Sequence, residues 1–286
     1  MSNTAAGVNL GTIGVHYVEG ELSPEAAADV ERLGYTAVWI SGTRQAHLTI
    51  VDRVLAATET LAVATGVVNI WHVAARAIAD TYHRLEAAYP GRFLLGIGVG
   101  HREFGADFRS PYQALVDYLD VLDECGVPKE RRVLAAPGPK VLRLSADRAA
   151  GAHPYLVPAT YTAGARETLG SGPLLATEHK VLLGTDAEKT RAAARPSVAN
   201  PYLSLSNYLA NLRRLGFTDA DLSDDGSDAL IDALVAQGDA ASVAAQLREH
   251  LTAGADHVAV HVVPDSEDPL ASLAELAPAL GLAGRD

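Results

Sequence analysis

Three histidines in this sequence stand where chemistry is expected, because each follows an apolar run that is typical of a buried strand. His16 follows the first such run, His72 follows the third, and His101 closes the fourth. An imidazole gains or loses a proton near neutral pH, so a histidine at a strand end can exchange a proton or hydrogen-bond with a reacting group. We therefore predict that His101, His16 and His72 are catalytic, with His101 as the first choice for the proton donor.

The remaining histidines are better explained by solvent or by packing. Those on predicted helices are expected to be solvated, and those in or beside predicted strands are expected to be hydrogen-bonded in the core. The first group contains His47, His83 and His250, and the second contains His153, His179, His257 and His261.

Other kinds of catalytic site are poorly supported by the residues. No HxH or HExxH motif and no pair of cysteines is present, so we expect no metal site. A Schiff-base lysine would have to stand at a strand end, and Lys180 alone among the lysines falls in a predicted strand. The glycines at 96, 98 and 100 lack the spacing of a dinucleotide-binding fingerprint. Proton transfer by histidine is therefore the chemistry that these residues favour.

The elements that must position these histidines alternate between strand and helix. Predicted strands fall at residues 9–15, 37–40, 61–67, 92–101, 132–135, 152–157, 174–183 and 257–263. A segment with the apolar spacing of an amphipathic helix follows each of them. This alternation implies a parallel sheet, and eight units imply closure into a (β/α)8 TIM barrel. The runner-up is an open doubly wound sheet, which would need unpaired edge strands that the pattern does not contain.

One barrel domain is expected to cover residues 1–286, with an all-helical insertion at 185–254 between the seventh and eighth strands. Chemistry in such barrels lies at the carboxyl ends of the strands. Residues that follow the predicted strands are therefore the ones to consider for a site.

The composition and net charge of the chain limit the kinds of partner that we expect it to bind. The chain has 286 residues, 48% of them hydrophobic, and a formal net charge of −12. This charge makes nucleic acid and an anionic membrane surface unfavourable partners. Cys125 is the one cysteine, and neither a signal peptide nor a membrane-spanning apolar stretch is evident. We expect a cytoplasmic protein that acts on a small molecule.

Five segments resemble one known family, the luciferase-like oxidoreductases, and within it the actinobacterial branch that uses the deazaflavin coenzyme F420. They are 64–71 (ATGVVNIW), 92–101 (RFLLGIGVGH), 149–155 (AAGAHPY), 207–217 (NYLANLRRLGF) and 253–258 (AGADHV). The segment 207–217 is the most specific to this branch, whereas the glycine-rich strand is shared by the wider family. The resemblance spans nearly the whole chain and implies the same (β/α)8 barrel.

The resemblance also implies where the cofactor binds. Members hold a flat tricyclic ring at the mouth of the barrel, against a non-proline cis peptide bond that corresponds here to Gly66–Val67. Asn69 would face the polar edge of the ring. The segment Gly98, Val99 and Gly100 would pass beside the cofactor, with His101 near its reacting face.

Two further contacts are implied for the phosphate and tail of the cofactor. Ala159 and Thr160 open a predicted helix, whose N-terminal amides can bind phosphate. Many relatives carry an acidic residue or a histidine just after the second strand, where this chain has Gly42, Thr43 and Arg44. Arg44 could instead contact the acidic tail of the deazaflavin, or the difference could weaken cofactor binding.

Three functions follow from this reading. The first is an F420-dependent oxidoreductase that transfers a hydride between C5 of the deazaflavin and a small organic substrate. The second is an FMN-dependent relative, since the same mouth accepts flavins elsewhere in the family. The third is a barrel that binds a cofactor or ligand without turnover, which the Gly42-Thr43 difference favours. Members are often dimers, so a homodimer is expected.

Overall fold

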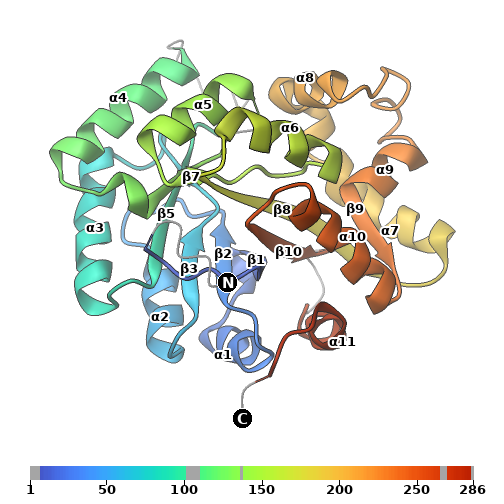
Figure 1. Cartoon of the computed structure of the whole chain (residues 1–286), viewed down its shortest axis with the longest axis horizontal. Helices are drawn as coiled ribbons and strands as arrows, with labels where there is room; N and C mark the ends of the chain where they lie inside the picture. Colours follow the sequence, from blue (N-terminus) through green and yellow to red (C-terminus); the bar gives the residue numbers. More distant parts are fainter. Residues whose placement is uncertain (1–6, 101–109, 136–137, 265–268, 285–286) are drawn as a thin grey trace.

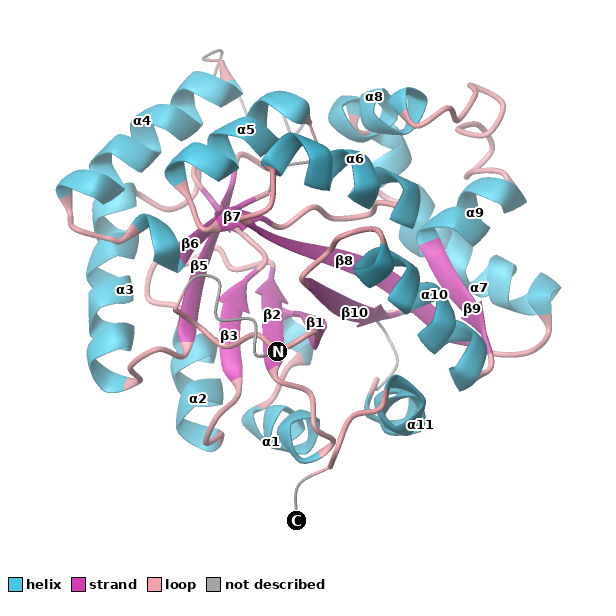
Figure 2. Ribbon diagram, viewed as in Figure 1, coloured by secondary structure: helices cyan, strands magenta, loops and turns pink. Residues whose placement is uncertain are grey.

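The computed structural model describes residues 7–100, 110–135, 138–264 and 269–284. Within these ranges, eight parallel strands form a closed ring and helices surround it (Figure 1). The strands stand in the centre of the molecule with the helices outside them (Figure 2). The predicted (β/α)8 barrel is therefore confirmed, and the open sheet is wrong.

The strands of the ring follow the chain in order. They are β1 (Ile13–Val18), β2 (Ala37–Ser41), β3 (Ala62–Thr65), β5 (Phe93–Gly98), β6 (Arg132–Leu134), β7 (Gly151–Ala152), β8 (Leu174–Leu183) and β10 (His257–Val262). Two further short strands lie beside the ring, namely β4 (Val68–Asn69), which pairs with β5, and β9 (Val235–Gly238), which pairs with β8. β10 closes the ring because it pairs with β1 on one edge and with β8 on the other.

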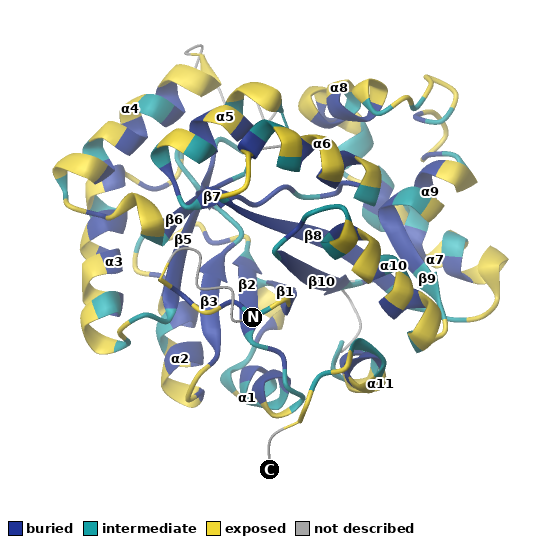
Figure 3. Ribbon diagram, viewed as in Figure 1, coloured by how far each residue is buried: buried dark blue, intermediate teal, exposed yellow. Residues whose placement is uncertain are grey.

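The helices connect successive strands on the outside. They are α1 (Pro24–Arg32), α2 (Thr49–Ala57), α3 (Ala75–Ala88), α4 (Pro111–Glu124), α5 (Pro139–Arg148), α6 (Ala159–Leu169), α7 (Ala187–Ala199), α8 (Ser206–Arg214), α9 (Asp228–Leu234), α10 (Ala240–Thr252) and α11 (Leu270–Leu280). Their apolar faces pack on the sheet and their other faces are exposed (Figure 3).

The barrel interior is filled by one large side chain among small ones. Trp39 is fully buried, and alanines from the neighbouring strands surround it. The indole stacks on the imidazole of His153 with ring centroids 3.9 Å apart, and its Nε1–H donates to Nε2 of His257 at 3.0 Å. Large and small side chains that alternate in this way fill a barrel without voids.

The bounds of several predicted strands differ from the structure, and two of these differences matter for the site. The first strand ends at Val18 instead of residue 15, so His16 lies inside the strand and points into the barrel. The sixth ends after Ala152 instead of residue 157. Pro154 and Pro158 have no backbone N–H for a ladder, and Leu156 has a positive φ of 55°. The chain therefore leaves the ring there and crosses the mouth of the barrel.

The insertion at 185–254 is not all-helical as predicted. Its segment 228–237 divides into helix α9 and strand β9, and Val235 of β9 lies opposite Lys180 of β8. A short apolar run can form a buried strand or a buried helix, and pairing with β8 decides the outcome here. The insertion also has its own hydrophobic core, which includes Leu205, Leu212 and Ile231.

Candidate functional site

The turn between β3 and β4 packs tightly on β5. The Gly66–Val67 peptide bond is cis, as the family resemblance implies. A Cβ atom on Gly98 would lie 2.6 Å from Cγ2 of Val67, and one on Gly96 would lie 1.8 Å from the carbonyl oxygen of Thr65. Glycine is therefore required in β5, because any side chain there would displace the turn.

The contact between the turn and β5 extends beyond Val67 and Gly98 to Asn69 and Gly100. A Cβ atom on Gly100 would lie 2.3 Å from Nδ2 of Asn69. The indole N–H of Trp71 donates to the carbonyl oxygen of Val99 at 2.8 Å. The structure thus brings together Gly66, Val67 and Asn69 with Gly98, Val99 and Gly100, although these groups are about thirty residues apart in the sequence.

A group of polar side chains lies beside this turn at the carboxyl ends of the strands. We call it the mouth cluster, and it consists of His16, His153, Tyr155, Glu178, Lys180 and His261, of which Tyr155 is half-buried and the others are buried. Gly66 of the turn lies directly against the mouth cluster. A Cβ atom on Gly66 would lie 3.3 Å from Nε2 of His153 and 3.5 Å from Cε1 of His16. The turn and the mouth cluster are therefore parts of one site.

The carboxylate of Glu178 is at the centre of the mouth cluster and is 0% exposed. One oxygen lies 3.0 Å from Nδ1 of His261, and the other accepts the backbone N–H of Leu156 at 2.9 Å. Burial alone would raise the pKa of Glu178, but the His261 hydrogen bond and the charge of Lys180 hold it below the usual value. Glu178 is therefore ionised at neutral pH and has a partner on each oxygen.

The ammonium of Lys180 is also buried, at 1% exposure. It donates to the hydroxyl of Tyr155 at 3.0 Å, and the hydroxyl of Tyr202 donates to the same oxygen at 3.0 Å. Its Nζ lies 5.2 Å from the ring centroid of Tyr155 and 5.6 Å from that of Tyr202. A carboxylate, two aromatic faces and a phenol oxygen thus stabilise the buried charge.

Two histidines of the mouth cluster are held as neutral hydrogen-bond acceptors. Nδ1 of His153 lies 2.8 Å from the carbonyl oxygen of Ala176, so this nitrogen carries the proton. The hydroxyl of Ser41 donates to the carbonyl oxygen of Tyr17 and accepts from Nε2 of His16. Burial lowers the pKa of His153 to about 4 and lowers that of His16 well below its usual value. The second nitrogen of each ring therefore offers a lone pair.

These lone pairs have no hydrogen-bond partner among the residues that the structure describes. Nδ1 of His16, Nε2 of His153 and Oγ1 of Thr43 are buried without a hydrogen bond. Buried polar atoms without partners are rare, and a bound ligand or water commonly satisfies them. A flavin or deazaflavin ring carries N–H and carbonyl groups at one edge, which match two acceptors and a hydroxyl. The residues present therefore fit such a ring.

The other predicted site residues are placed as follows. His101 lies outside the described residues. Arg44 and His72 are exposed on the loops after β2 and β4, whereas the mouth cluster is buried. Ala159 and Thr160 form the first turn of α6, so the predicted start of this helix is confirmed. His16 is the predicted catalytic histidine that the described structure places in the mouth cluster.

Sequence reasoning missed Glu178, Lys180 and Tyr155 and assigned His261 to the core. A signal was present, because Glu178 and Lys180 stand two residues apart in a strand that is apolar at both ends. A spacing of two places both side chains on the same face of a strand. Buried charges on one face of a central strand indicate a site more strongly than a histidine after a strand.

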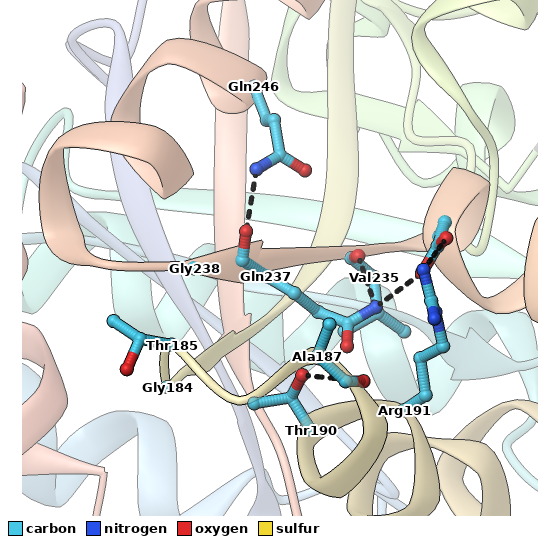
Figure 4. Close-up of a pocket in the computed structure, with 10 residues that line it drawn as sticks. Gly184, Thr185, Ala187, Thr190, Arg191, Val235, Gln237, Gly238 and Gln246 are labelled. Carbon is cyan, nitrogen blue, oxygen red and sulfur yellow. Dashed lines mark hydrogen bonds and ion pairs between the residues drawn. The ribbon is translucent and has the colours of Figure 1, made fainter.

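A separate pocket of about 250 Å³ lies beside β9, outside the ring of eight strands (Figure 4). Several of its polar groups satisfy one another: Arg191 binds Asp232 through two hydrogen bonds of 2.7 Å, and Gln246 donates to the backbone of Gln237. Asp186 and Asp239 cap the two helices that begin beside it. Oε1 of Gln237 is buried without a partner among the described residues, but this pocket lies away from the mouth cluster.

Within the described ranges, no cluster of histidine, cysteine and carboxylate side chains could hold a metal ion. The helices described are also too short or too polar to cross a membrane.

The family model for luciferase-like monooxygenases matches residues 21–257. This chain belongs to the luciferase-like monooxygenase family. The match includes β2 to β9, the cis peptide bond and most of the mouth cluster. No curated protein matches the sequence significantly.

Solved structures of this family share the fold at low sequence identity. An F420-dependent secondary alcohol dehydrogenase is 16% identical with a TM-score of 0.74, over 96% of this chain and 99% of that one. The F420-dependent tetrahydromethanopterin reductase from Methanopyrus kandleri is 15% identical with a TM-score of 0.70, over 94% and 98% of the two chains. The oxygenating constituent of 3,6-diketocamphane monooxygenase from Pseudomonas putida, in complex with FMN, is 15% identical with a TM-score of 0.62, over 94% and 98%.

Proposed function

We propose that this chain is an oxidoreductase that uses coenzyme F420 to transfer a hydride to or from a small organic substrate. The observation that carries the proposal is the glycine-lined contact between the β3–β4 turn and β5, directly beside buried polar atoms that have no partner in the described part of the chain. Two of the solved structures compared above are F420-dependent enzymes of the same fold. A bound deazaflavin would supply the two-electron hydride chemistry.

The chain's own residues would hold and orient the ring. The lone pairs of His16 and His153 would accept N–H groups, and the hydroxyl of Thr43 would donate to a carbonyl. The first amides of α6, at Ala159 and Thr160, would bind the phosphate. The buried surroundings would exclude water and strengthen these hydrogen bonds.

FMN is the second candidate cofactor, because one of the compared family structures contains it. Titration of the purified chain with reduced F420 and, separately, with FMN distinguishes the two by fluorescence. Micromolar binding of F420 with much weaker binding of FMN supports the proposal. If the chain binds FMN and not F420, FMN replaces F420 as the proposed cofactor. If the chain binds neither, a barrel without redox function is favoured.

Two glycine substitutions test whether the turn forms the binding site. In Gly98→Ala the new methyl group would lie 2.6 Å from Val67, so the turn must move and F420 affinity should fall at least tenfold. The matched control is Gly172→Ala, because a Cβ atom on Gly172 meets nothing within 4 Å. Equal affinity in both variants would contradict the proposed location.

A further inference from the structure

The mouth cluster contains one imidazole that is paired with a carboxylate. Nδ1 of His261 has three polar neighbours, namely a Glu178 oxygen at 3.0 Å, the Tyr155 hydroxyl at 3.2 Å and Nζ of Lys180 at 3.3 Å. The ammonium can only donate, and it has a shorter bond to the Tyr155 oxygen. The ionised carboxylate can only accept. Nδ1 of His261 therefore carries a proton and donates it to Glu178, so any proton that the ring exchanges with a substrate is carried by Nε2.

The surroundings hold this pair in one orientation. Both oxygens of Glu178 are engaged, one by His261 and the other by the backbone of Leu156. Glu178 thus cannot turn away, and it fixes both the tautomer and the ring plane of its partner. A carboxylate that orients an imidazole in this way is the arrangement that makes histidine an efficient acid or base.

The pair lies next to the place where we expect the ligand. The ring of His261 contacts the ring of His16 with centroids 4.6 Å apart, and His16 in turn lies against Gly66 of the turn. The lone pairs of His16 and His153 mark the same region. The imidazole of His261 is thus one ring away from the segment proposed to hold the cofactor.

We propose that His261 is the catalytic acid–base residue of this enzyme and that Glu178 is its positioning residue. The inference rests on the proposed function for the identity of the hydride donor. In the reducing direction, a hydride from the reduced deazaflavin or flavin adds to one atom of a C=C or C=O bond. The proton on Nε2 of His261 adds to the other atom, or to the enolate oxygen of a conjugated ketone. The substrate is reduced, the cofactor is oxidised, and His261 regains a proton from water.

A matched pair of variants on β10 tests the assignment. In His261→Asn the amide keeps a donor for Glu178 and removes Nε2. In His257→Asn the amide keeps a donor for the carbonyl of Gly11, which Nδ1 of His257 contacts at 3.0 Å, and also removes Nε2. The assay is single-turnover oxidation of bound reduced F420 by 2-cyclohexen-1-one, with FMN as the second cofactor.

We expect His261→Asn to slow this step about 100-fold or more, and Glu178→Gln to slow it about tenfold or more. Cofactor affinity should stay within threefold of wild type in both variants, and His257→Asn should retain the wild-type rate. A rate within threefold of wild type in His261→Asn, an equal loss in the two asparagine variants, or no turnover by the cofactor-bound wild type overturns the proposal.

A second measurement decides the assignment without any cofactor. The imidazole nitrogens of the ¹⁵N-histidine-labelled chain report which nitrogen carries the proton, and His261→Asn identifies the signals of His261. A proton on Nδ1 of His261 supports the pair, and a neutral ring with its proton on Nε2 overturns it. If neither F420 nor FMN binds while Nδ1 is protonated, the proposed function fails and the Glu178–His261 pair stands.

Discussion

Two groups of buried histidines lie on opposite faces of β8, and their partners differ. On the inner face the mouth cluster places His261 against the ionised carboxylate of Glu178. On the outer face His179 hydrogen-bonds to His250 of α10 at 3.0 Å, and His250 lies 2.8 Å from the hydroxyl of Thr162. The outer histidines, His179 and His250, hydrogen-bond to neutral groups. The inner group contains the buried charges of Glu178 and Lys180.

The difference separates packing from chemistry. A chain of neutral hydrogen bonds between a strand and two helices fixes their relative positions at modest net gain. Buried charges are costly to hold, so natural proteins keep them mainly where a site uses them. Because side chains alternate along a strand, β8 carries the structural His179 on its outer face and the charged Glu178 and Lys180 on its inner face.

The largest effect that distinguishes the two faces should come from removing one buried charge. Glu178→Leu would leave the buried Lys180 ammonium and the His261 imidazole without their carboxylate, which should lower the free energy of unfolding by about 3–5 kcal/mol. The double variant His179→Leu/His250→Leu removes both partners of a neutral pair together, so it should change stability by about 1 kcal/mol or less. Urea denaturation at pH 7.5 measures both, and equal losses would contradict the comparison.

A second, smaller effect should appear in the pH dependence of stability. Burial lowers the pKa of His250 to about 3 and lowers that of His179, so both stay neutral in the folded chain while the unfolded chain is protonated below about pH 6.5. Their contribution is intact above pH 6.5 and is lost as the pH falls. Between pH 6 and pH 5 His250 should remove about 1 kcal/mol of stability, and His179 should add to this loss.

Glu178 should respond in a different pH window. Its folded pKa is lowered, so its contribution is present above about pH 4.5 and is lost only at more acidic pH. The double leucine variant should therefore make the decline in melting temperature between pH 6 and pH 5 less steep, and the buried neutral His16 and His153 should cause part of the decline that remains. Glu178→Gln should leave the slope in this range unchanged. A decline that keeps its wild-type slope in the double variant would show that other groups cause it.

The smallest effects should come from removing one hydroxyl partner on each face. Thr162→Val removes the partner of His250, and Ser41→Ala removes the partner of His16. Each should cost about 1 kcal/mol in unfolding free energy. Only Ser41→Ala should also weaken F420 binding, severalfold, because the ring of His16 could then turn away from the ligand. Equal F420 affinity in both variants would remove His16 from the binding site.

The ring of eight strands could be predicted because each strand is apolar and each helix is amphipathic, so local pattern and packing agree. The prediction failed at residues whose burial or secondary structure is decided by tertiary contacts. His250 was expected to be solvated because it lies on a helix, yet it is 1% exposed against β8. Val235 was expected in a helix, and pairing with β8 made it part of a strand.

The site was predicted only in part, for a similar reason. The family resemblance located the turn at Gly66–Val67 and its glycine-lined neighbour Gly98. Histidines after strands were a weaker guide, because burial and partners decide which imidazole is reactive. The partners of His261 come from residues 155, 178 and 180, and a single sequence does not reveal which side chains the closure of β8 on β10 brings together.

β8 has more than one neighbour along a single edge. β7 occupies that edge only at Leu174 and Leu175, and β9 occupies it from Lys180 onward. Between Leu175 and Lys180 neither strand pairs with this edge of β8. The chain after β7 crosses this gap, and there the Tyr155 hydroxyl accepts a hydrogen bond from the Tyr202 hydroxyl of the insertion. The insertion therefore contributes a side chain beside the mouth cluster and takes no part in closing the ring of eight strands. A change in the length or shape of the insertion would thus alter the surroundings of Tyr155 and leave the barrel intact.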